Sequence, residues 1–249
     1  MSVSIKNATE IAAMRQGGQI LAKVLREVAA AVKPGVTTAE LDTVAAQAVA
    51  AAGAEAAFKG YQGFPFTICI SINDEVVHGL PSRTRVLAEG DIVGLDFGVT
   101  FKGMITDGTV TVPVGAVDAD AERLLSTTNQ ALSAGIAQAT AGNRVGDISA
   151  AIEKVLRQGR LGVIEELIGH GVGHSLHEDP VIPNLGRAGT GPVLKAGMTL
   201  AIEPMATLGS PRVRLADDGW TYATVDGSLA AQFEHTVLIT DGPAEILTA

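Results

Sequence analysis

Three of the five histidines in this 249-residue chain lie within one glycine-rich stretch, "GHGVGHSLHEDP", as His170, His174 and His177. Imidazole nitrogens bind divalent metals and also transfer protons near neutral pH. The glycines at positions 171 and 173 disfavour a helix, and the helical HExxH zinc motif is absent. The stretch is therefore expected to form a loop that serves a metal site, an acid–base site or no site at all, depending on what completes it.

Four carboxylates in apolar, strand-like segments are candidates to complete a metal site. They are Asp96 in "IVGLDFG", Asp107 in "FKGMITDG", Glu203 in "LAIEPM" and Glu234 in "QFEHTVLI". Each alone would ordinarily be solvated or salt-bridged, but residues 86–99 and 198–208 contain no lysine or arginine. Carboxylates gathered without a cation repel one another and become protonated, so their convergence predicts bound divalent metal.

His170 is the expected imidazole ligand, and the resulting oxygen-rich set favours Mn, Co, Fe or Zn without ranking them. Five side chains, some of them bidentate or bridging, provide more ligand atoms than one ion normally uses, so two ions are predicted. In a pair about 3.5–4 Å apart, a bridging water acquires a pKa near about 7 and the second ion polarises a carbonyl. This chemistry is hydrolysis by a metal-bridging water or hydroxide.

The remaining histidines separate by position. His177 is not needed for the metals and is free to donate a hydrogen bond to a scissile carbonyl or a developing oxyanion. His78 follows an extended segment in "NDEVVHGLP" and is a candidate substrate-facing imidazole. His174 is expected to be a surface or supporting residue. His235 adjoins Glu234, and strand alternation points it to the opposite face, where a structural role is expected.

The elements that must position these residues follow from hydrophobic periodicity and turn residues. Helices are predicted over 9–33, 37–53, 120–142 and 147–158, and extended segments over 67–73, 91–115 and 198–240, the last two as hairpins. "VLAEGDIVGLD" ends at Asp96 and "VLKAGMTLAIE" ends at Glu203, 107 residues later. The same offset relates Gly35 to Gly142. The sequence therefore predicts a duplicated helix–helix–strand–hairpin unit.

The duplication predicts an α/β (α+β) fold with pseudo-two-fold symmetry. With no linker or low-complexity stretch between the halves, residues 1–249 are expected to form a single catalytic domain, with pseudo-repeats at about 9–114 and 119–245. Equivalent strand ends tend to meet near the pseudo-axis of such a fold. This arrangement would bring carboxylates from both halves together.

Composition narrows the class of protein. The net charge of −9 and the pI of about 5.0 argue against nucleic acid or an anionic membrane as a main partner. The single cysteine excludes an intrachain disulfide, and neither a signal peptide nor an apolar run of about 18 residues is present. A soluble, cytoplasmic protein is expected, with a monomer as the default.

The sequence resembles the type I methionine aminopeptidases across nearly its whole length. Five blocks carry the resemblance in the family's order: "GFPFTICISINDEVVHGLP", "GDIVGLDFGVTFKGMITDGTVT", "GHGVGHSLHEDP", "LKAGMTLAIEPM" and "FEHTVLIT". The resemblance implies the pita-bread fold, a dinuclear metal centre, and removal of the initiator methionine from nascent proteins and peptides. A chain that begins almost directly with its first helix looks like the short bacterial form, which would leave any ribosome contact to the catalytic domain's own surface.

The resemblance also implies roles for individual residues. It assigns the metals to Asp96, Asp107, His170, Glu203 and Glu234. Asp107 and Glu234 would bridge both ions, and Glu203 would also shuttle the proton of the nucleophilic water. His78 would contact the substrate near the scissile bond, and His177 would stabilise the tetrahedral intermediate.

A methionine pocket is implied near the aromatic stretch "GYQGFPFTIC". Its walls would be Tyr61, Phe64, Cys69 and Trp220. Aromatics are only 4% of the chain, and a thioether packs well against aromatic faces, although ordinary core packing is an equally open interpretation. Gln62 stands where many members have histidine, and Leu176 where an aromatic is frequent. These departures put the exact substrate preference in question.

Two rival functions are weaker. A prolidase or aminopeptidase P usually carries a further amino-terminal domain, for which 249 residues leave no room. A non-catalytic peptide-binding module on the same fold would be expected to lose metal ligands, whereas all five acceptors are present. Cleavage of Met-Ala-Ser against Ala-Pro peptides would separate the first rival from a methionine aminopeptidase.

Overall fold

The computed structural model describes residues 3–249, so residues 1 and 2 of the predicted domain lie outside the described part. Its α-helices are α1 (Ala8–Ala31), α2 (Thr38–Ala51), α3 (Ala119–Ile136) and α4 (Val145–Gln158), with a short 3-10 turn at Tyr61–Gly63. The strands of the first half are β1 (Glu55–Ala56), β2 (Cys69–Ile72), β3 (Glu75–Val77), β4 (Ile92–Phe101) and β5 (Met104–Pro113). Those of the second half are β6 (Gly162–Val163), β7 (Gly169–Gly171), β8 (Glu178–Ile182), β9 (Thr199–Ile202), β10 (Met205–Thr207), β11 (Val213–Leu215), β12 (Tyr222–Thr224), β13 (Ala230–Gln232), β14 (Glu234–Leu238) and β15 (Glu245–Ile246).

Local signals in the sequence set the helix starts. Asn7 caps α1 by accepting from two backbone N–H groups, and the Glu10 side chain accepts from the Asn7 N–H in return. Thr37 and Glu40 form the same reciprocal cap on α2. The helix predicted over 120–142 is wrong at its end, because α3 stops at Ile136 and the following residues form tighter turns.

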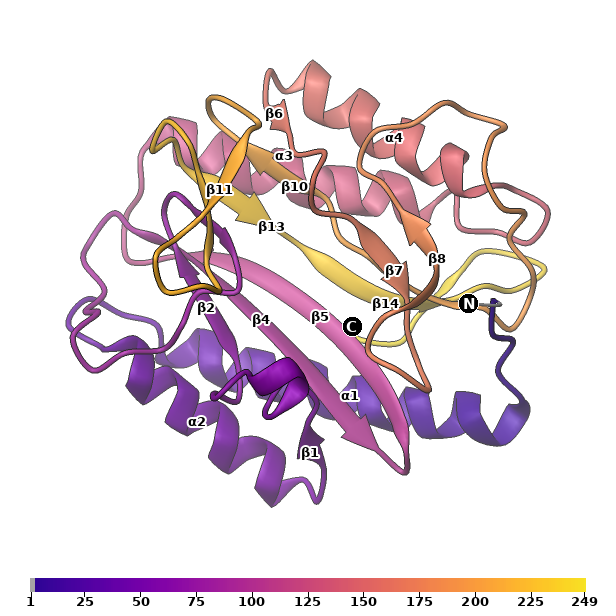
Figure 1. Cartoon of the computed structure of the whole chain (residues 1–249), viewed down its shortest axis with the longest axis horizontal. Coiled ribbons are helices and arrows are strands. Elements are labelled where there is room, and N and C mark those ends of the chain that lie inside the picture. Colours follow the sequence, from indigo (N-terminus) through magenta and orange to yellow (C-terminus); the bar gives the residue numbers. More distant parts are fainter. Residues whose placement is uncertain (1–2) are drawn as a thin grey trace.

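The main sheet has nine strands and joins the two halves of the chain. Its order is β1-β4-β5-β14-β9-β7-β8, with β2 also on β4 and β15 also on β14. Figure 1 shows the long strands β4 and β5 running between the α1–α2 pair and the α3–α4 pair. The seam between the halves is the short β5–β14 ladder, which pairs Glu234 with Thr109 and His235 with Gly108.

Side chains alternate across β4, which separates the core from the opposite face of the sheet. Leu95, Phe97 and Val99 pack into a core with residues of α1 and α2. A second core lies between α3, α4 and strands that include β9 and β14. Asp96 has the opposite parity to its apolar neighbours, so it points to the side of the sheet away from these helices.

The predicted duplication is confirmed by the order of the elements and by the spacing of several equivalent ones. The bounds of α2 and α4 are related by the predicted 107-residue offset, and so are the isolated bridges Thr37–Val86 and Arg144–Val193. The predicted hairpin over 198–240 is also present, because β9–β14 and β10–β13 continue one antiparallel register. Its far end is extended by β11 and β12, and β12 pairs with β3 of the first half. No helix in residues 3–249 is long and apolar enough to cross a membrane.

Candidate active site

A cavity of about 350 Å³ lies over the sheet. It is lined by every residue that the sequence assigned to the site. The eleven predicted residues that line it are Tyr61, Phe64, Cys69, His78, Asp96, Asp107, His170, His177, Glu203, Trp220 and Glu234. They come from both halves of the chain and from segments far apart in sequence. The tertiary structure thus brings together the proposed metal ligands, the proposed catalytic imidazoles and the proposed pocket walls.

Thr109 organises the carboxylates at the seam of the sheet. It pairs with Asp96 on β4 and with Glu234 on β14, so the three residues form a row across adjacent strands. Its hydroxyl donates to Glu234 Oε2 at 2.9 Å. Asp107, two residues earlier on β5, lies on the same face of the strand. The register of three strands therefore places three of the carboxylates side by side.

His170 lies on the short strand β7, so the prediction that this residue belongs to a loop is wrong. The neighbouring glycines explain the difference, because a Cβ at Gly169 would lie 2.5 Å from the Ala201 carbonyl oxygen and one at Gly171 would lie 2.4 Å from that of Asp179. Residues without side chains are thus needed to insert β7 between β8 and β9. The loop proper begins after Gly171 and includes His174 and His177.

The ligand atoms of Asp107, His170 and Glu234 lie within 4.8 Å of one another. His170 Nδ1 donates to the Gly171 carbonyl oxygen at 2.9 Å, so Nε2 has a free lone pair. That Nε2 lies 3.5 Å from Glu203 Oε1. The imidazole is therefore oriented as a metal ligand, with Glu203 beside it.

Burial and mutual repulsion raise the pKa values of the four carboxylates. Burial raises the pKa of Asp96 to about 7. Burial and then the neighbouring carboxylates raise the pKa values of Asp107, Glu203 and Glu234 well above their usual range. Within residues 3–249, no lysine or arginine forms an ion pair with any of the four.

This donor set fits divalent cations. Glu234 Oε1 is buried and has no hydrogen-bond partner among the described residues, so a polar ligand atom is left available. Positive charge at the centre would offset the burial and the mutual repulsion that otherwise keep these carboxyl groups protonated. The sequence prediction that Asp96, Asp107, His170, Glu203 and Glu234 share one centre is consistent with the cavity that all five line.

Glu203 is held by a residue that the sequence reasoning missed. Gln232 Nε2 donates to Glu203 Oε2 at 2.8 Å, and Gln232 also lines the cavity. A signal was present, because Gln232 lies two residues before Glu234, and alternate residues of an extended segment share a face. The same spacing relates Thr109 to Asp107.

The phenolic oxygen of Tyr61 lies 2.9 Å from His177 Nδ1. The His177 ring also lies beside that of His170, with centroids 4.3 Å apart. Burial lowers the pKa of His177 below its ordinary value, so the ring is neutral at neutral pH. A neutral imidazole beside the carboxylates can still donate one hydrogen bond into the cavity.

His78 adopts a left-handed backbone conformation with φ of 60°, directly after β3. Burial, and secondarily the charge of His177, lowers its pKa to about 4. Next to it, a Cβ on Gly79 would lie 2.1 Å from the Ile70 carbonyl oxygen, so only glycine permits this close approach. The His78 ring contacts Tyr222 edge-on, with centroids 6.0 Å apart.

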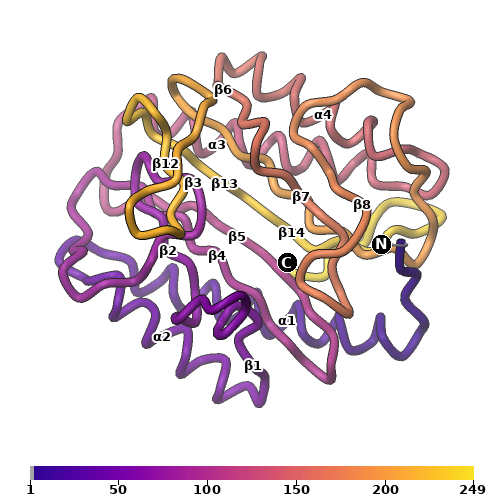
Figure 2. Tube along the Cα trace, viewed as in Figure 1, coloured from indigo at the N-terminus to yellow at the C-terminus, as the bar shows by residue number. Residues whose placement is uncertain are grey.

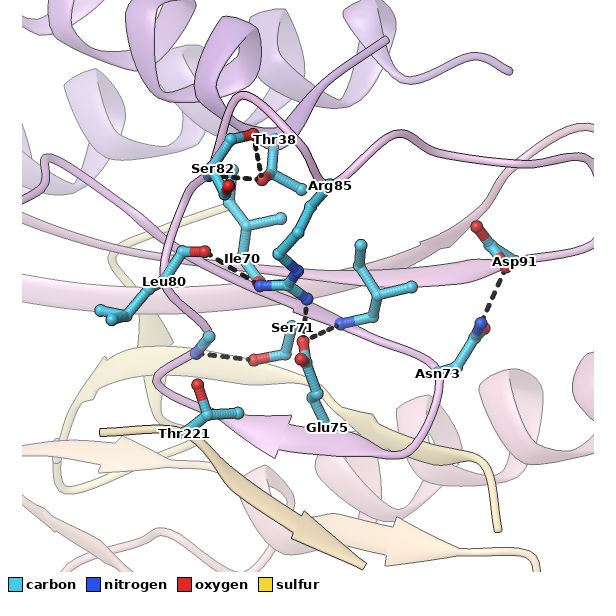
Figure 3. A network of polar contacts seen from close by, with 12 residues as sticks. Thr38, Ile70, Ser71, Asn73, Glu75, Leu80, Ser82, Arg85, Asp91 and Thr221 are labelled. Carbon is cyan, nitrogen blue, oxygen red and sulfur yellow. Dashed lines mark hydrogen bonds and ion pairs between the residues drawn. The ribbon is translucent and has the colours of Figure 1, made fainter. Parts of the chain in front are cut away.

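A polar network fixes the segment on both sides of His78. Arg85 donates to the Leu80 carbonyl oxygen at 2.9 Å and forms an ion pair with Glu75 (Figure 3). Glu75 also accepts from the Ile72 N–H at 2.8 Å. One guanidinium thus connects the segment after His78 to the β2–β3 hairpin before it. The strained conformation of His78 is maintained by these contacts.

The apolar end of the cavity matches the predicted methionine pocket in composition. Phe64 packs edge-on against Trp220, with ring centroids 5.3 Å apart. Cys69 and Leu176 belong to the same apolar cluster, and Leu176 and Gln62 also line the cavity. Burial raises the pKa of the Cys69 thiol well above its usual range, so this side chain acts as a small apolar group.

Two histidines lie outside the cavity lining, as the sequence predicted. His174 Nε2 is 2.9 Å from Glu10 Oε1, and its Nδ1 is 3.1 Å from Ser4 Oγ. His235 Nδ1 is 2.9 Å from Thr248 Oγ1, on the opposite side of β14 from Glu234. Both imidazoles therefore connect parts of the scaffold.

Known proteins resemble this chain over nearly its full length. The model of metallopeptidase family M24 matches residues 12–241. The methionine aminopeptidase of Clostridium acetobutylicum is 46% identical, covering 99% of this chain and 98% of that protein. Methionine aminopeptidase 1 of Mycobacterium tuberculosis is 45% identical, covering 98% of this chain and 94% of that protein.

Solved structures support the same assignment. The methionine aminopeptidase of Thermotoga maritima superposes with a TM-score of 0.98 at 45% identity, covering 99% of each chain. The prolidase of Pyrococcus furiosus has a TM-score of 0.79 at 23% identity and is covered over only 65% of its length, so it shares the fold alone. Because the family model and close relatives span almost the whole chain, this protein belongs to metallopeptidase family M24 and, within it, to the methionine aminopeptidases.

Proposed function

We propose that this protein removes the N-terminal methionine from peptides and newly made proteins by metal-dependent hydrolysis. One observation carries the proposal: five acceptors from both halves of the chain line one cavity beside aromatic side chains. We assign the metals to Asp96, Asp107, His170, Glu203 and Glu234. Bound divalent ions would polarise the scissile carbonyl and acidify the attacking water.

The chain's own residues handle the proton and the developing charge. Glu203, held at Oε2 by Gln232, accepts the proton of the attacking water and passes it to the leaving amine. The Tyr61 hydroxyl lies 2.9 Å from His177 Nδ1, and in the tautomer that we assign it donates to this nitrogen and leaves the proton on Nε2 for a hydrogen bond to the oxyanion. His78, neutral at neutral pH, contacts the substrate near the scissile bond.

Methionine selectivity is assigned to the apolar end of the cavity. Phe64 and Trp220 offer ring faces and edges to a thioether, and Tyr61 and Cys69 close the pocket beside them. We propose N-terminal Met peptides and nascent chains as substrates.

We also propose the domain organisation, oligomeric state, location and partners of this protein. A single catalytic domain is supported by the continuous sheet that joins the two halves. We propose a monomer in the cytoplasm that meets nascent chains through its own surface, with the ribosome as a candidate contact. The net charge of −9 makes direct binding to exposed RNA unfavourable, so such a contact would be with ribosomal protein.

The decisive experiment combines metal content with turnover. Chelator-treated protein is reconstituted with Mn, Co, Fe or Zn, and Met-Ala-Ser and Ala-Pro peptides are offered to each sample. Cleavage of Met-Ala-Ser that depends on bound metal supports the proposal, whereas preferential cleavage of Ala-Pro would overturn it. Glu203→Gln should retain the fold and lose turnover, and His177→Ala should lower kcat by about 10²–10³.

A further inference from the structure

The N-terminal segment, meaning residues 3–7 here, packs on the loop that carries His177. Figure 2 shows the indigo trace before α1 passing near β8, and the contacts of Lys6 confirm the proximity. Lys6 is only 4% exposed, although it lies near the start of the chain. Its Nζ lies 2.6 Å from Glu178 Oε2, and its backbone N–H donates to the Gly197 carbonyl oxygen at 2.8 Å. A buried ion pair thus joins two segments that are 172 residues apart in sequence.

The two carboxylate oxygens of Glu178 accept hydrogen bonds from different segments, one from the N-terminal segment and the other from the loop that carries His177. Oε2 accepts from Lys6, and Oε1 accepts from the backbone N–H groups of His174 at 2.6 Å and Ser175 at 3.0 Å. These N–H groups belong to the turn that immediately precedes His177. The position of one carboxylate therefore sets both the turn and the residue next to it, which is His177 itself.

The aliphatic part of the Lys6 side chain packs against Gly173, at the start of the turn that precedes His177. A Cβ added to Gly173, whose φ is +151°, would lie 2.3 Å from Lys6 Cε. The Gly173 carbonyl oxygen accepts from the Ile105 N–H at 2.7 Å, which connects the turn to β5. The loop is thus held between the lysine stem and the strand that carries Asp107.

A second link runs through Glu10. Its Oε1 lies 2.9 Å from His174 Nε2, while its Oε2 accepts from the Asn7 N–H in the cap of α1. Ser4 Oγ contacts the other ring nitrogen of His174 at 3.1 Å. The start of α1 and the turn before His177 therefore share one carboxylate, and the N-terminal segment spans both contacts.

The charges make the contact specific. A buried ammonium and a buried carboxylate are each costly alone and are tolerated only as a pair with further hydrogen bonds. Removing Lys6 would leave the charge of Glu178 uncompensated. The Glu178 carboxylate would then move towards solvent, and the turn that is hydrogen-bonded to it would move as well. Small displacements of a catalytic group lower rates steeply, because the reacting geometry is narrow.

We propose that Lys6 and Glu178 are positioning residues for His177, so that the N-terminal segment sets the orientation of this imidazole in the cavity. The inference rests on the proposed function for its kinetic consequence, but its structural consequence is independent of activity. The imidazole of His177 lies beside the Tyr61 hydroxyl, and neither Lys6 nor Glu178 lines the cavity itself, although Glu178 is the next residue in the chain after His177.

The test compares Lys6→Met, Glu178→Gln and the combined Lys6→Met/Glu178→Gln with Arg15→Met as a matched control. Arg15 lies inside α1, after the capped start of that helix, and pairs with Glu245 at the surface. Ring resonances of the five histidines, read by ¹⁵N–¹H correlation, report the His177 environment without any turnover. Kinetics on Met-Ala-Ser with metal-loaded protein supply the second measurement.

Lys6→Met should shift the His177 ring signals and lower kcat by about 10-fold to 100-fold, with KM changed less than about twofold. In a His177→Ala background, Lys6→Met should cause no further loss of kcat. The combined variant, which restores charge balance, should recover part of the loss, and Arg15→Met should behave as wild type.

Unchanged His177 signals and kcat in Lys6→Met would overturn the inference, as would an equal loss of kcat with and without His177. If Lys6→Met does not fold, Glu178→Gln takes its place. This variant keeps an acceptor oxygen for the turn but removes the charge that pairs with Lys6. It is tested by the same His177 ring signals and the same kcat. Wild-type protein that lacks turnover while Lys6→Met still shifts the His177 ring would count against the proposed function and not against this inference.

Discussion

The ring centroids of His170 and His177 lie 4.3 Å apart, and their Nδ1 atoms have partners of different kinds. His170 Nδ1 faces a backbone carbonyl oxygen, which can only accept, so this nitrogen has the proton. His177 Nδ1 faces the Tyr61 hydroxyl, which can donate. With the Tyr61 hydroxyl as donor, the two adjacent imidazoles would present a lone pair and a proton to the same cavity, which suits the metal-ligand and hydrogen-bond-donor roles that we propose for them.

Tyr61→Phe tests the orientation of His177. Without the hydroxyl, either ring nitrogen of His177 can be protonated, so kcat should fall by about 2-fold to 10-fold, the contribution of one hydrogen bond of about 0.5–1.5 kcal/mol. KM should stay unchanged because the ring remains. Tyr61→Leu removes the ring as well and should also raise KM. Equal kcat in wild type and Tyr61→Phe would refute this role of the hydroxyl.

Gln232→Leu tests the support of Glu203. The change removes the donor to Glu203 Oε2 and leaves that oxygen buried without a partner. Partners of metal ligands typically contribute about 10-fold to 100-fold in metal affinity or activity. Metal titration followed by calorimetry, together with kcat at saturating metal, should show a loss in that range. A variant with wild-type affinity and rate would mean that Glu203 is held in place by other contacts.

The metal-free protein should become less stable as pH rises from about 6.5 to 8.5. Burial holds the pKa of Asp96 at about 7 and those of Asp107, Glu203 and Glu234 above their usual range. Over this range the folded state retains protons that the unfolded chain has released, so the free energy of unfolding falls with rising pH. Thermal unfolding of chelator-treated protein at several pH values measures the slope.

Two controls isolate the carboxylates in that experiment. His78 and His170 have pKa values lowered to about 4, and they act in the opposite direction until the imidazoles of the unfolded chain have lost their protons, which is nearly complete above about pH 7.5, so the upper part of the range reports the carboxylates. Asp96→Asn should reduce the slope, and added divalent metal should abolish it because bound ligands are ionised. A metal-free Tm that rises with pH in this range would contradict the assignment.

Arg85→Met should destabilise the fold by about 1–3 kcal/mol, because charged hydrogen bonds to Glu75 and to the Leu80 carbonyl oxygen are lost in a half-buried setting. Urea unfolding measures the change. Arg157→Met is the matched control, since its pair with Glu153 is an exposed pair on one helix that contributes about 0.3–0.5 kcal/mol. Equal effects of the two substitutions would show that the network around His78 contributes nothing beyond a surface ion pair.

The helices, the duplication and the five acceptors were predictable because their signals are local or periodic. The caps at Asn7 and Thr37 depend on residues three positions apart, and Asp96 interrupts an apolar strand whose alternation shows which side chains face the core. Other details were not predictable. His170 lies on a strand because glycines permit close contact with two neighbouring strands, and α3 ends early through tighter turns.

The sequence by itself determined which residue types could bind metal, which side of each strand they occupy and that two similar halves contribute them. Only the tertiary structure decided that Thr109 lies between Asp96 and Glu234, that Tyr61 contacts His177, and that Lys6 reaches Glu178. The physical reason is distance along the chain: periodicity and capping act within a few residues, whereas these contacts depend on strand register and side-chain packing between segments far apart in sequence.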